Sequence, residues 1–228
     1  MMKQLVLDMG LAKGPSLANF CVGPNAAALE HLTLWLGQPG SGVRRSPVPT
    51  YLWGGSGCGK THLLQALRSA LSAQGLRVGW LDATVPVAAE YDEGWAAVLM
   101  DDVHAFDGRQ QQAAFNWFVN AQTQQVAVLA AGSLPPADLK LRDDLRTRLG
   151  WGLVYQVHAL SDAEKTQALQ QHALARGFEL PNEVTTYLLR HGRRDLPALL
   201  ATLDALDDHC LRLKRGASVP LLKEVMRA

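Results

Sequence analysis

Cysteine is scarce in this sequence, and neither sign of charge is in excess. The 228 residues contain three cysteines, Cys21, Cys58 and Cys210, whose spacing fits neither a disulfide framework nor a zinc site. Lysine and arginine number 22 against 21 aspartates and glutamates, which gives a formal net charge of +1. A dedicated DNA-binding domain usually carries a clear basic excess. We therefore expect a reducing compartment and no bulk binding of a polyanion, although this balance does not argue against a local basic site.

Long apolar runs are also missing. The first residues, MMKQLVLDMGLAKG, lack the apolar core of a secretory signal and include Asp8. No stretch reaches the about 18 uninterrupted apolar residues of a membrane-spanning helix. The sequence has no internal repeat, and its apolar fraction of 48% is typical of a globular chain. These absences predict a cytoplasmic protein with no membrane partner.

The order of apolar segments predicts two domains. At about 150 residues per domain, the length allows one domain and a smaller second one. Four short apolar segments alternate with helical patterns and are predicted to be strands: 49–53, 78–81, 96–100 and 126–131. Near-continuous apolar strands are typical of a parallel sheet buried on both faces. Helical patterns are predicted at 25–36, with Asn25 as the N-cap, and at 113–119, and a further helix after residue 61 ends at Gly75.

After Leu160 the pattern is helical only. Ser161-Asp-Ala-Glu164 resembles a capping box. Helices are predicted at 161–176, 181–191, 194–213 and 218–227. We therefore predict an N-terminal tail over residues 1–17, an α/β nucleotide-binding domain over 18–159, and a small all-helical domain over 160–228.

A glycine-rich segment follows the first predicted strand. It satisfies G-x-x-x-x-G-K-[ST] at every fixed position, and its residues are Gly54, Gly55, Ser56, Gly57, Cys58, Gly59, Lys60 and Thr61. Such glycines let backbone N–H groups converge on phosphate oxygens, while the lysine reaches the β- and γ-phosphates and the threonine hydroxyl binds Mg²⁺. Cys58 is interpreted as a small loop residue. His62 is included in the nucleotide-binding segment, with a structural role expected for its imidazole.

An acidic pair follows the third predicted strand. Asp101 is predicted to hold the metal with Thr61, and Asp102 to orient the attacking water. Many related hydrolases carry glutamate at the second position, and the shorter aspartate predicts weak or no intrinsic turnover. The alternative is a pair of carboxylates that face solvent at the strand end.

Four further segments resemble the DnaA family of AAA+ ATPases. They are Leu145–Leu153, Ser133–Pro136, Asn19–Pro24 and the helix start at Arg194. The resemblance implies an AAA+ P-loop fold with a helical lid, bound to ADP or ATP with Mg²⁺. It assigns Arg148 as an arginine finger that acts in trans, and Arg194 as a contact to the protein's own nucleotide.

The arginine assignments have alternatives. Arg146 or Arg142 replaces Arg148 as the finger if the alignment shifts, and Arg148 pairs with Asp144 if it is only a surface charge. Arg194 is otherwise a solvated charge at a helix start. The predicted strand before Ser133 ends in Ala-Ala-Gly, where the family usually carries a polar sensor residue, and this departure puts self-hydrolysis in doubt.

The N-terminal tail resembles a peptide that docks on the sliding clamp of DNA polymerase. In this reading Gln4 fills a polar subsite, and apolar side chains fill the remainder of the site: Leu5, Leu7 and Met9. The alternative is a first strand or an apolar tail. A DnaA-like ATPase module with this tail and without a helix-turn-helix domain resembles the Hda family of DnaA inactivators.

The resemblance to Hda implies a regulator of replication initiation. Such a protein docks on the DNA polymerase III sliding clamp (its β subunit) and stimulates ATP hydrolysis by DnaA. It implies DnaA and the clamp as partners, a homodimer or oligomer as a further assembly, and contact with DNA and the nucleoid only through the clamp.

Two other functions fit the P-loop: a DnaC-like helicase loader or transposition helper ATPase, and a small-molecule kinase. Binding to the helicase would favour the first, and turnover of a small substrate without a protein partner would favour the second.

Overall fold

The computed structural model describes residues 14–37, 45–86, 88–193 and 195–227. Within this part of the chain, residue contacts cluster into two compact units. The first is Gly14–Ala159, and the second begins at Leu160. Each unit has its own buried core. Among the described residues, no helix has both the length and the apolar character needed to cross a membrane.

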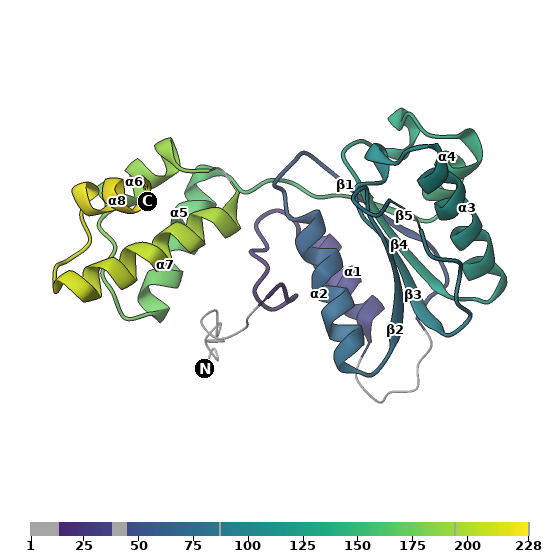
Figure 1. The fold of residues 1–228 in the computed structure, drawn as a ribbon, viewed down its shortest axis with the longest axis horizontal. Helices are drawn as coiled ribbons and strands as arrows, with labels where there is room; N and C mark the ends of the chain where they lie inside the picture. Colours follow the sequence, from purple (N-terminus) through teal and green to yellow (C-terminus); the bar gives the residue numbers. More distant parts are fainter. Residues whose placement is uncertain (1–13, 38–44, 87, 194, 228) are drawn as a thin grey trace. The chain divides into compact units, whose positions relative to one another are not determined.

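The first unit is built on a five-stranded parallel sheet in the order β2-β3-β4-β1-β5 (Figure 1). The strands are β1 (Thr50–Trp53), β2 (Arg77–Leu81), β3 (Trp95–Met100), β4 (Ala127–Gly132) and β5 (Leu153–Gln156). The expected parallel α/β sheet is therefore confirmed. The last strand, β5, was not predicted, and it lies at the edge of the sheet with mostly exposed side chains.

Helices cover both faces of this sheet (Figure 1). They are α1 (Ala26–Leu36), α2 (Lys60–Ala73), α3 (Gly108–Thr123) and α4 (Asp143–Leu149), with 3₁₀ turns at Val103–Ala105 and Pro136–Asp138. Side chains alternate between the two faces along a strand. Val98 and Met100 of β3 therefore pack with α3 and α4, whereas Ala97 and Leu99 pack with α1 and α2. The sheet is thus buried on both sides, as its apolar strands predict.

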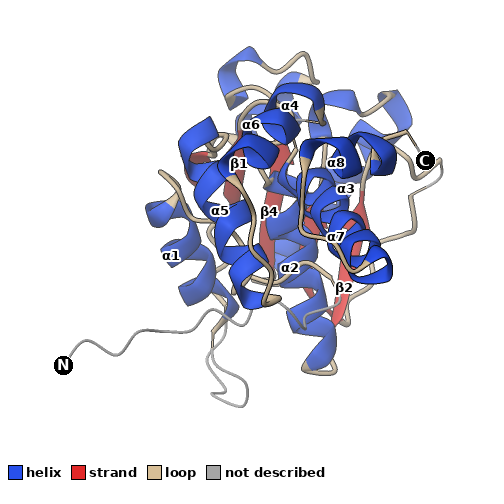
Figure 2. Cartoon of the chain, turned by 90° about the vertical axis from the view of Figure 1, so that its left-hand side faces the viewer, coloured by secondary structure: helices blue, strands red, loops and turns tan. Residues whose placement is uncertain are grey.

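The regular elements described after Leu160 are all helices, which Figure 2 draws in blue. They are α5 (Asp162–Ala175), α6 (Asn182–His191), α7 (Leu196–Leu213) and α8 (Val219–Val225). The capping box predicted at Ser161 is confirmed, because its hydroxyl accepts from the Glu164 N–H and the Glu164 carboxylate accepts from the Ser161 N–H. Between α5 and α7, the Arg176 guanidinium donates to buried Asp207 at 2.7 Å.

Candidate nucleotide-binding site

The glycine-rich loop connects β1 to α2 at the carboxyl end of the sheet, where open α/β sheets bind ligands. Two of its glycines leave no room for a side chain. A Cβ on Gly54 would lie 2.1 Å from the backbone oxygen of Val157, and a Cβ on Gly59 would lie 2.7 Å from the Phe20 ring. Gly59 also has a φ of +102°, in the region that favours glycine. The loop backbone is therefore fixed by its neighbours in the fold.

Lys60 is held inside this loop. Its side chain is buried, and its Nζ donates to the backbone oxygens of Gly54 at 2.8 Å and Gly55 at 3.0 Å. The Cys58 sulfur lies 3.6 Å from the same nitrogen, and the Cys58 side chain is buried in the core against α2. Lys60 is the first residue of α2, so its ammonium and the positive end of the helix lie at the same place. This arrangement suits a phosphate group.

Asp101 is buried directly after β3 and faces Thr61. The Asp102 N–H donates to the Asp101 carboxylate at 2.9 Å, and the Thr61 hydroxyl is near enough to lower its pKa. Burial raises the pKa of Asp101, and the nearby Thr61 hydroxyl offsets part of that rise. A hydroxyl and a carboxylate are ligands suited to Mg²⁺, which proteins often bind through one or two carboxylates together with substrate phosphates. The pair fits that role.

Asp102 differs from its buried neighbour. Half of its side chain is exposed, and its Oδ1 lies 4.0 Å from the Nδ1 of His104. Its backbone adopts a left-handed conformation with a φ of 49°. The alternative of two solvent-facing carboxylates therefore describes Asp102 but not Asp101. A half-exposed carboxylate beside a buried one can reach a water molecule.

The segment before α1 packs against the nucleotide loop. The His62 ring nitrogen Nε2 lies 3.0 Å from the Ser16 backbone oxygen, and the His62 ring lies 5.7 Å from that of Phe20. These contacts agree with the structural role expected for His62. The aromatic ring of Phe20 in turn closes the space beside Gly59.

Asn25 has a role that the sequence did not reveal. It occupies the N-cap position of α1, as predicted, although its side chain forms no capping hydrogen bond. Instead its Oδ1 accepts from the His158 N–H at 2.7 Å, and its Nδ2 donates to the His158 oxygen at 3.0 Å. The carboxamide thus satisfies both backbone groups of a residue 133 positions away. The role of asparagine at position 25 comes from a contact between distant segments, which the local sequence pattern does not indicate.

The arginines of α4 fall into two kinds. Arg142 pairs with Asp144 at 2.7 Å, and Arg146 pairs with Asp143 at 2.8 Å. Arg148 has no salt bridge within the described residues, so the alternative in which it pairs with Asp144 is wrong.

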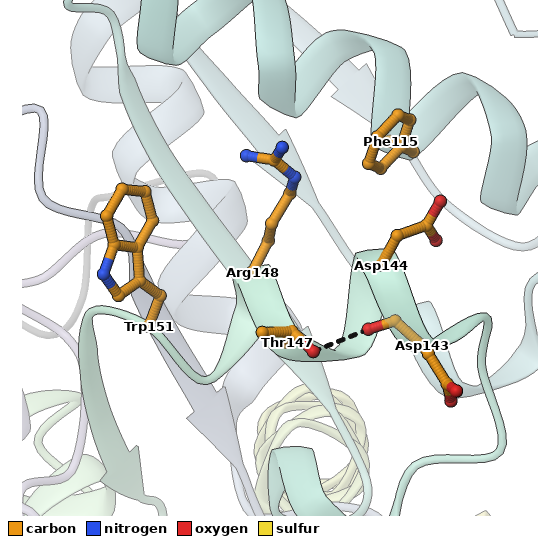
Figure 3. Close-up of a pocket in the computed structure, with 6 residues that line it drawn as sticks. All are labelled: Phe115, Asp143, Asp144, Thr147, Arg148 and Trp151. Carbon is orange, nitrogen blue, oxygen red and sulfur yellow. Dashed lines mark hydrogen bonds between the residues drawn. The ribbon is translucent and has the colours of Figure 1, made fainter.

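Arg148 lies instead beside aromatic rings. Its guanidinium carbon is 5.1 Å from the ring centre of Phe115 and 5.9 Å from that of Phe118. It lines a hollow of about 510 Å³, shown in Figure 3, together with the exposed Trp151. The guanidinium is therefore held by ring faces and remains available to an anionic group of another molecule.

The end of β4 carries no polar side chain. Ala130, Ala131 and Gly132 are buried there. A Cβ at Gly132 would lie 2.2 Å from the hydroxyl of Tyr51, which donates to the Leu134 oxygen at 2.8 Å. A tyrosine on the neighbouring strand β1 therefore occupies the space of a residue-132 side chain, and Ser133 is the first polar side chain after the strand.

Several predicted site residues lie outside the described residues. One of them is Arg194, which is expected to contact the nucleotide from the lid. The others are the expected clamp contacts Gln4, Leu5, Leu7 and Met9. The structure brings together the other residues that are predicted to bind nucleotide. They lie on the loop after β1, at the start of α2 and at the end of β3. Arg148 belongs to the separate surface of α4.

Comparison with known proteins identifies relatives of both units. Residues 162–226 match the family model of the lid domain of Hda. The chain resembles domain III of the replication initiation protein DnaA from Thermotoga maritima, with a TM-score of 0.72 and 20% identity over 93% of this chain and 95% of that one.

Two further solved structures share the fold. AMPPCP-bound DnaA from Aquifex aeolicus gives a TM-score of 0.66 and 24% identity, over 87% of this chain and 66% of that chain. A P216G mutant of RuvB from Thermotoga maritima gives a TM-score of 0.64 and 15% identity, over 95% of this chain and 73% of the RuvB chain. These similarities confirm the expected AAA+ fold with a helical lid.

Proposed function

We propose that the chain is an Hda-like AAA+ protein of the DnaA family, and that it inactivates the replication initiator by stimulating hydrolysis of DnaA-bound ATP; the match of its lid to the Hda model and the shared fold with DnaA support this proposal. One observation carries the proposal beyond the family. Arg148 is the arginine of α4 that has no acidic partner among the described residues, and it borders an open hollow. An arginine supplied in trans to a γ-phosphate is worth about 10³–10⁵ in rate.

The first step is binding of an adenine nucleotide, ADP or ATP, with Mg²⁺. The solved DnaA from Aquifex aeolicus is bound to AMPPCP, a nucleotide analogue. In this chain the Lys60 ammonium and the start of α2 would receive the phosphates, and Thr61 with Asp101 would hold the metal. When bound, the metal would neutralise phosphate charge. Arg194, predicted from the sequence to begin a lid helix, would contact the same nucleotide.

Intrinsic turnover would be weak. Asp102 is one methylene shorter than the glutamate of many related hydrolases, and half of its side chain faces solvent. The end of β4 has no polar side chain to support the attacking water. The nucleotide bound to this protein would therefore have a structural role, and hydrolysis would occur on the ATP of the partner.

That partner would be an ATP-bound DnaA molecule, and the reacting group would be its γ-phosphate. Arg148 would stabilise the charge that spreads over the phosphoryl oxygens in the transition state. Contact with Phe115 limits the positions of the guanidinium before the partner arrives. A preorganised charge costs less reorganisation at the moment of reaction.

The clamp would provide the location. Gln4, Leu5, Leu7 and Met9 would dock residues 4–9 on the DNA polymerase III sliding clamp, in the cytoplasm at the nucleoid. This arrangement would link inactivation of DnaA to completed loading of the clamp. A homodimer or larger oligomer on the clamp belongs to the same proposal.

The test is an assay of DnaA-bound ATP on DNA that carries loaded clamps, with and without this protein. We expect rapid conversion to ADP only when both the clamp and the protein are present. Leu7→Ala should lose clamp binding and stimulation while nucleotide binding persists, whereas Lys3→Ala, outside the docking residues, should behave as the unmodified protein. Absence of stimulation, together with capture of the replicative helicase in a pull-down, would favour a helicase loader instead.

A further inference from the structure

One surface of the helical lid gathers basic side chains around an aromatic ring. Lys223 of α8 lies over the ring of Tyr187 of α6, with Nζ 5.1 Å from the ring centre. The same ring stacks on His191, with centroids 4.2 Å apart and planes 30° apart. Arg190 lies three residues from Tyr187 on α6, and such residues share one side of a helix.

Arg227 extends this surface beyond the end of α8. Its N–H bonds to the Glu224 oxygen at 3.2 Å, which continues the helical turn, and it follows Lys223 by four residues. The side chains of Arg190, Lys223 and Arg227 belong to exposed residues. We call the set Tyr187, Arg190, His191, Lys223 and Arg227 the basic lid surface; Figure 1 labels α6 and α8, which carry most of it.

The cations of this surface are not neutralised by the lid itself. Within the described residues, Arg190, Lys223 and Arg227 form no salt bridge, whereas Arg176 pairs with Asp207. The adjacent carboxylate of Glu224 is bound by His209 at 3.2 Å.

A further acid, Glu183, lies one turn before Tyr187 at the start of α6. The three cations Arg190, Lys223 and Arg227 outnumber the two neighbouring acids Glu183 and Glu224, which leaves a small local excess of positive charge in a chain whose formal net charge is +1.

We propose that the basic lid surface contacts the phosphate backbone of duplex DNA without reading its sequence. Guanidinium and ammonium groups are the common phosphate contacts of proteins, and such contacts orient a protein on DNA. The stack of Lys223, Tyr187 and His191 restrains the lysine before binding. This inference goes beyond the proposed function, in which DNA is reached only through the clamp. It places a second, direct contact on the lid.

The test measures binding of the full-length protein to a fluorescently labelled duplex of arbitrary sequence by anisotropy, without DnaA or clamp. Backbone contacts of this kind predict a dissociation constant of about 10⁻⁴–10⁻⁶ M at physiological salt. Each phosphate contact contributes about 0.9 to the slope of log K against log salt. Arg190→Gln with Lys223→Gln should therefore reduce the slope by about 1.8 and weaken binding more than about tenfold at moderate salt.

The matched control is Arg109→Gln with Lys140→Gln, which removes the same charge from exposed positions of the first unit. It should bind the duplex as the unmodified protein does, and both double variants should unfold at the unmodified temperature. The proposal is overturned if the unmodified protein shows no salt-dependent binding, or if both double variants lose affinity equally. It is also overturned if the lid variant binds DNA normally but loses clamp or DnaA binding, since the surface would then recognise a protein. Because neither partner is present in the anisotropy assay, its outcome is separate from that of the proposed function.

Discussion

At the scale of single residues, the nucleotide loop contains positions required by the backbone and positions required by chemistry. Gly54 and Gly59 are in the first group, because a Cβ at either position would collide with a neighbour. Lys60 and Thr61 are in the second, because each places a polar group where phosphate or metal would bind. The sequence motif predicts both groups without separating them.

The Gly54→Ala substitution tests the steric requirement of the backbone by itself. The added methyl would lie 2.1 Å from the Val157 oxygen, which belongs to the backbone and cannot rotate away. Overpacking of this kind typically costs about 1–3 kcal/mol. We expect that loss in the free energy of unfolding, measured with urea. Gly55→Ala is the matched control, because its Cβ meets nothing within 4 Å, and a comparable loss there would refute the steric explanation.

The charged Asp101 carboxylate should make the nucleotide-free protein less stable at neutral pH than a variant with a neutral side chain at this position. Its pKa is raised by burial, so the folded state binds the proton more tightly than the unfolded state. The free energy of unfolding therefore falls as the pH rises from the unfolded pKa, about 3.9, through the raised folded pKa. Asp101→Asn should be more stable than the unmodified protein at pH 7, and the difference should vanish below about pH 3.9.

Unfolding by urea across this pH range checks the Asp101 prediction, together with a nucleotide-binding assay. The variant should lose affinity for the nucleotide with Mg²⁺ while it gains stability. A variant that is less stable at pH 7 would mean that the Asp102 N–H and the nearby Thr61 hydroxyl stabilise the carboxylate by more than its burial costs.

At the scale of elements, the sequence predicts buried strands better than exposed ones. The residues of β3 and β4 are nearly all apolar and mostly buried, and both strands were predicted within one residue of their ends. In β5, three of the four side chains are exposed, and its strand conformation comes from pairing with β1. That pairing joins segments about 100 positions apart, from Thr50↔Leu153 to Trp53↔Gln156, which no local pattern records.

Helix ends follow a similar rule. The predicted helix at 113–119 begins at Gly108 in the structure, because Asp107 and Gln110 form a capping box around a polar first turn. The apolar pattern marks only the buried middle of that helix. Asn25 shows the reverse case, in which a residue typical of a cap bonds elsewhere.

The capping box of α5 gives a test at this scale. Ser161→Ala removes the acceptor for the Glu164 N–H, which should lower the free energy of unfolding of the lid by about 1 kcal/mol. Chemical denaturation followed by far-ultraviolet circular dichroism measures it. Glu164→Gln preserves a side-chain acceptor for the Ser161 N–H and should change stability by less than half as much; equal losses would show that the box does not act as described.

At the scale of the whole molecule, the chain combines an AAA+ fold with a lid that matches the Hda model. The alternation of buried strands with helices, the glycine-rich loop and the acid pair could be predicted from the sequence, because each depends on residues close together in the chain. The partners of Arg142, Arg146 and Arg148 could not, because several charged side chains on one short helix allow several pairings. The clamp contacts remain a prediction from the sequence.

We propose that Arg148 acts on ATP bound to DnaA. The most direct measurement is single-turnover hydrolysis of DnaA-bound ATP with loaded clamps, comparing Arg148→Ala with Arg146→Ala, whose arginine already pairs with Asp143. Arg148→Ala should fold, bind nucleotide and dock on the clamp, but return hydrolysis to the rate of DnaA alone, a loss of up to about 10³–10⁵. Arg146→Ala should still stimulate. Full stimulation by a folded Arg148→Ala protein would contradict the account.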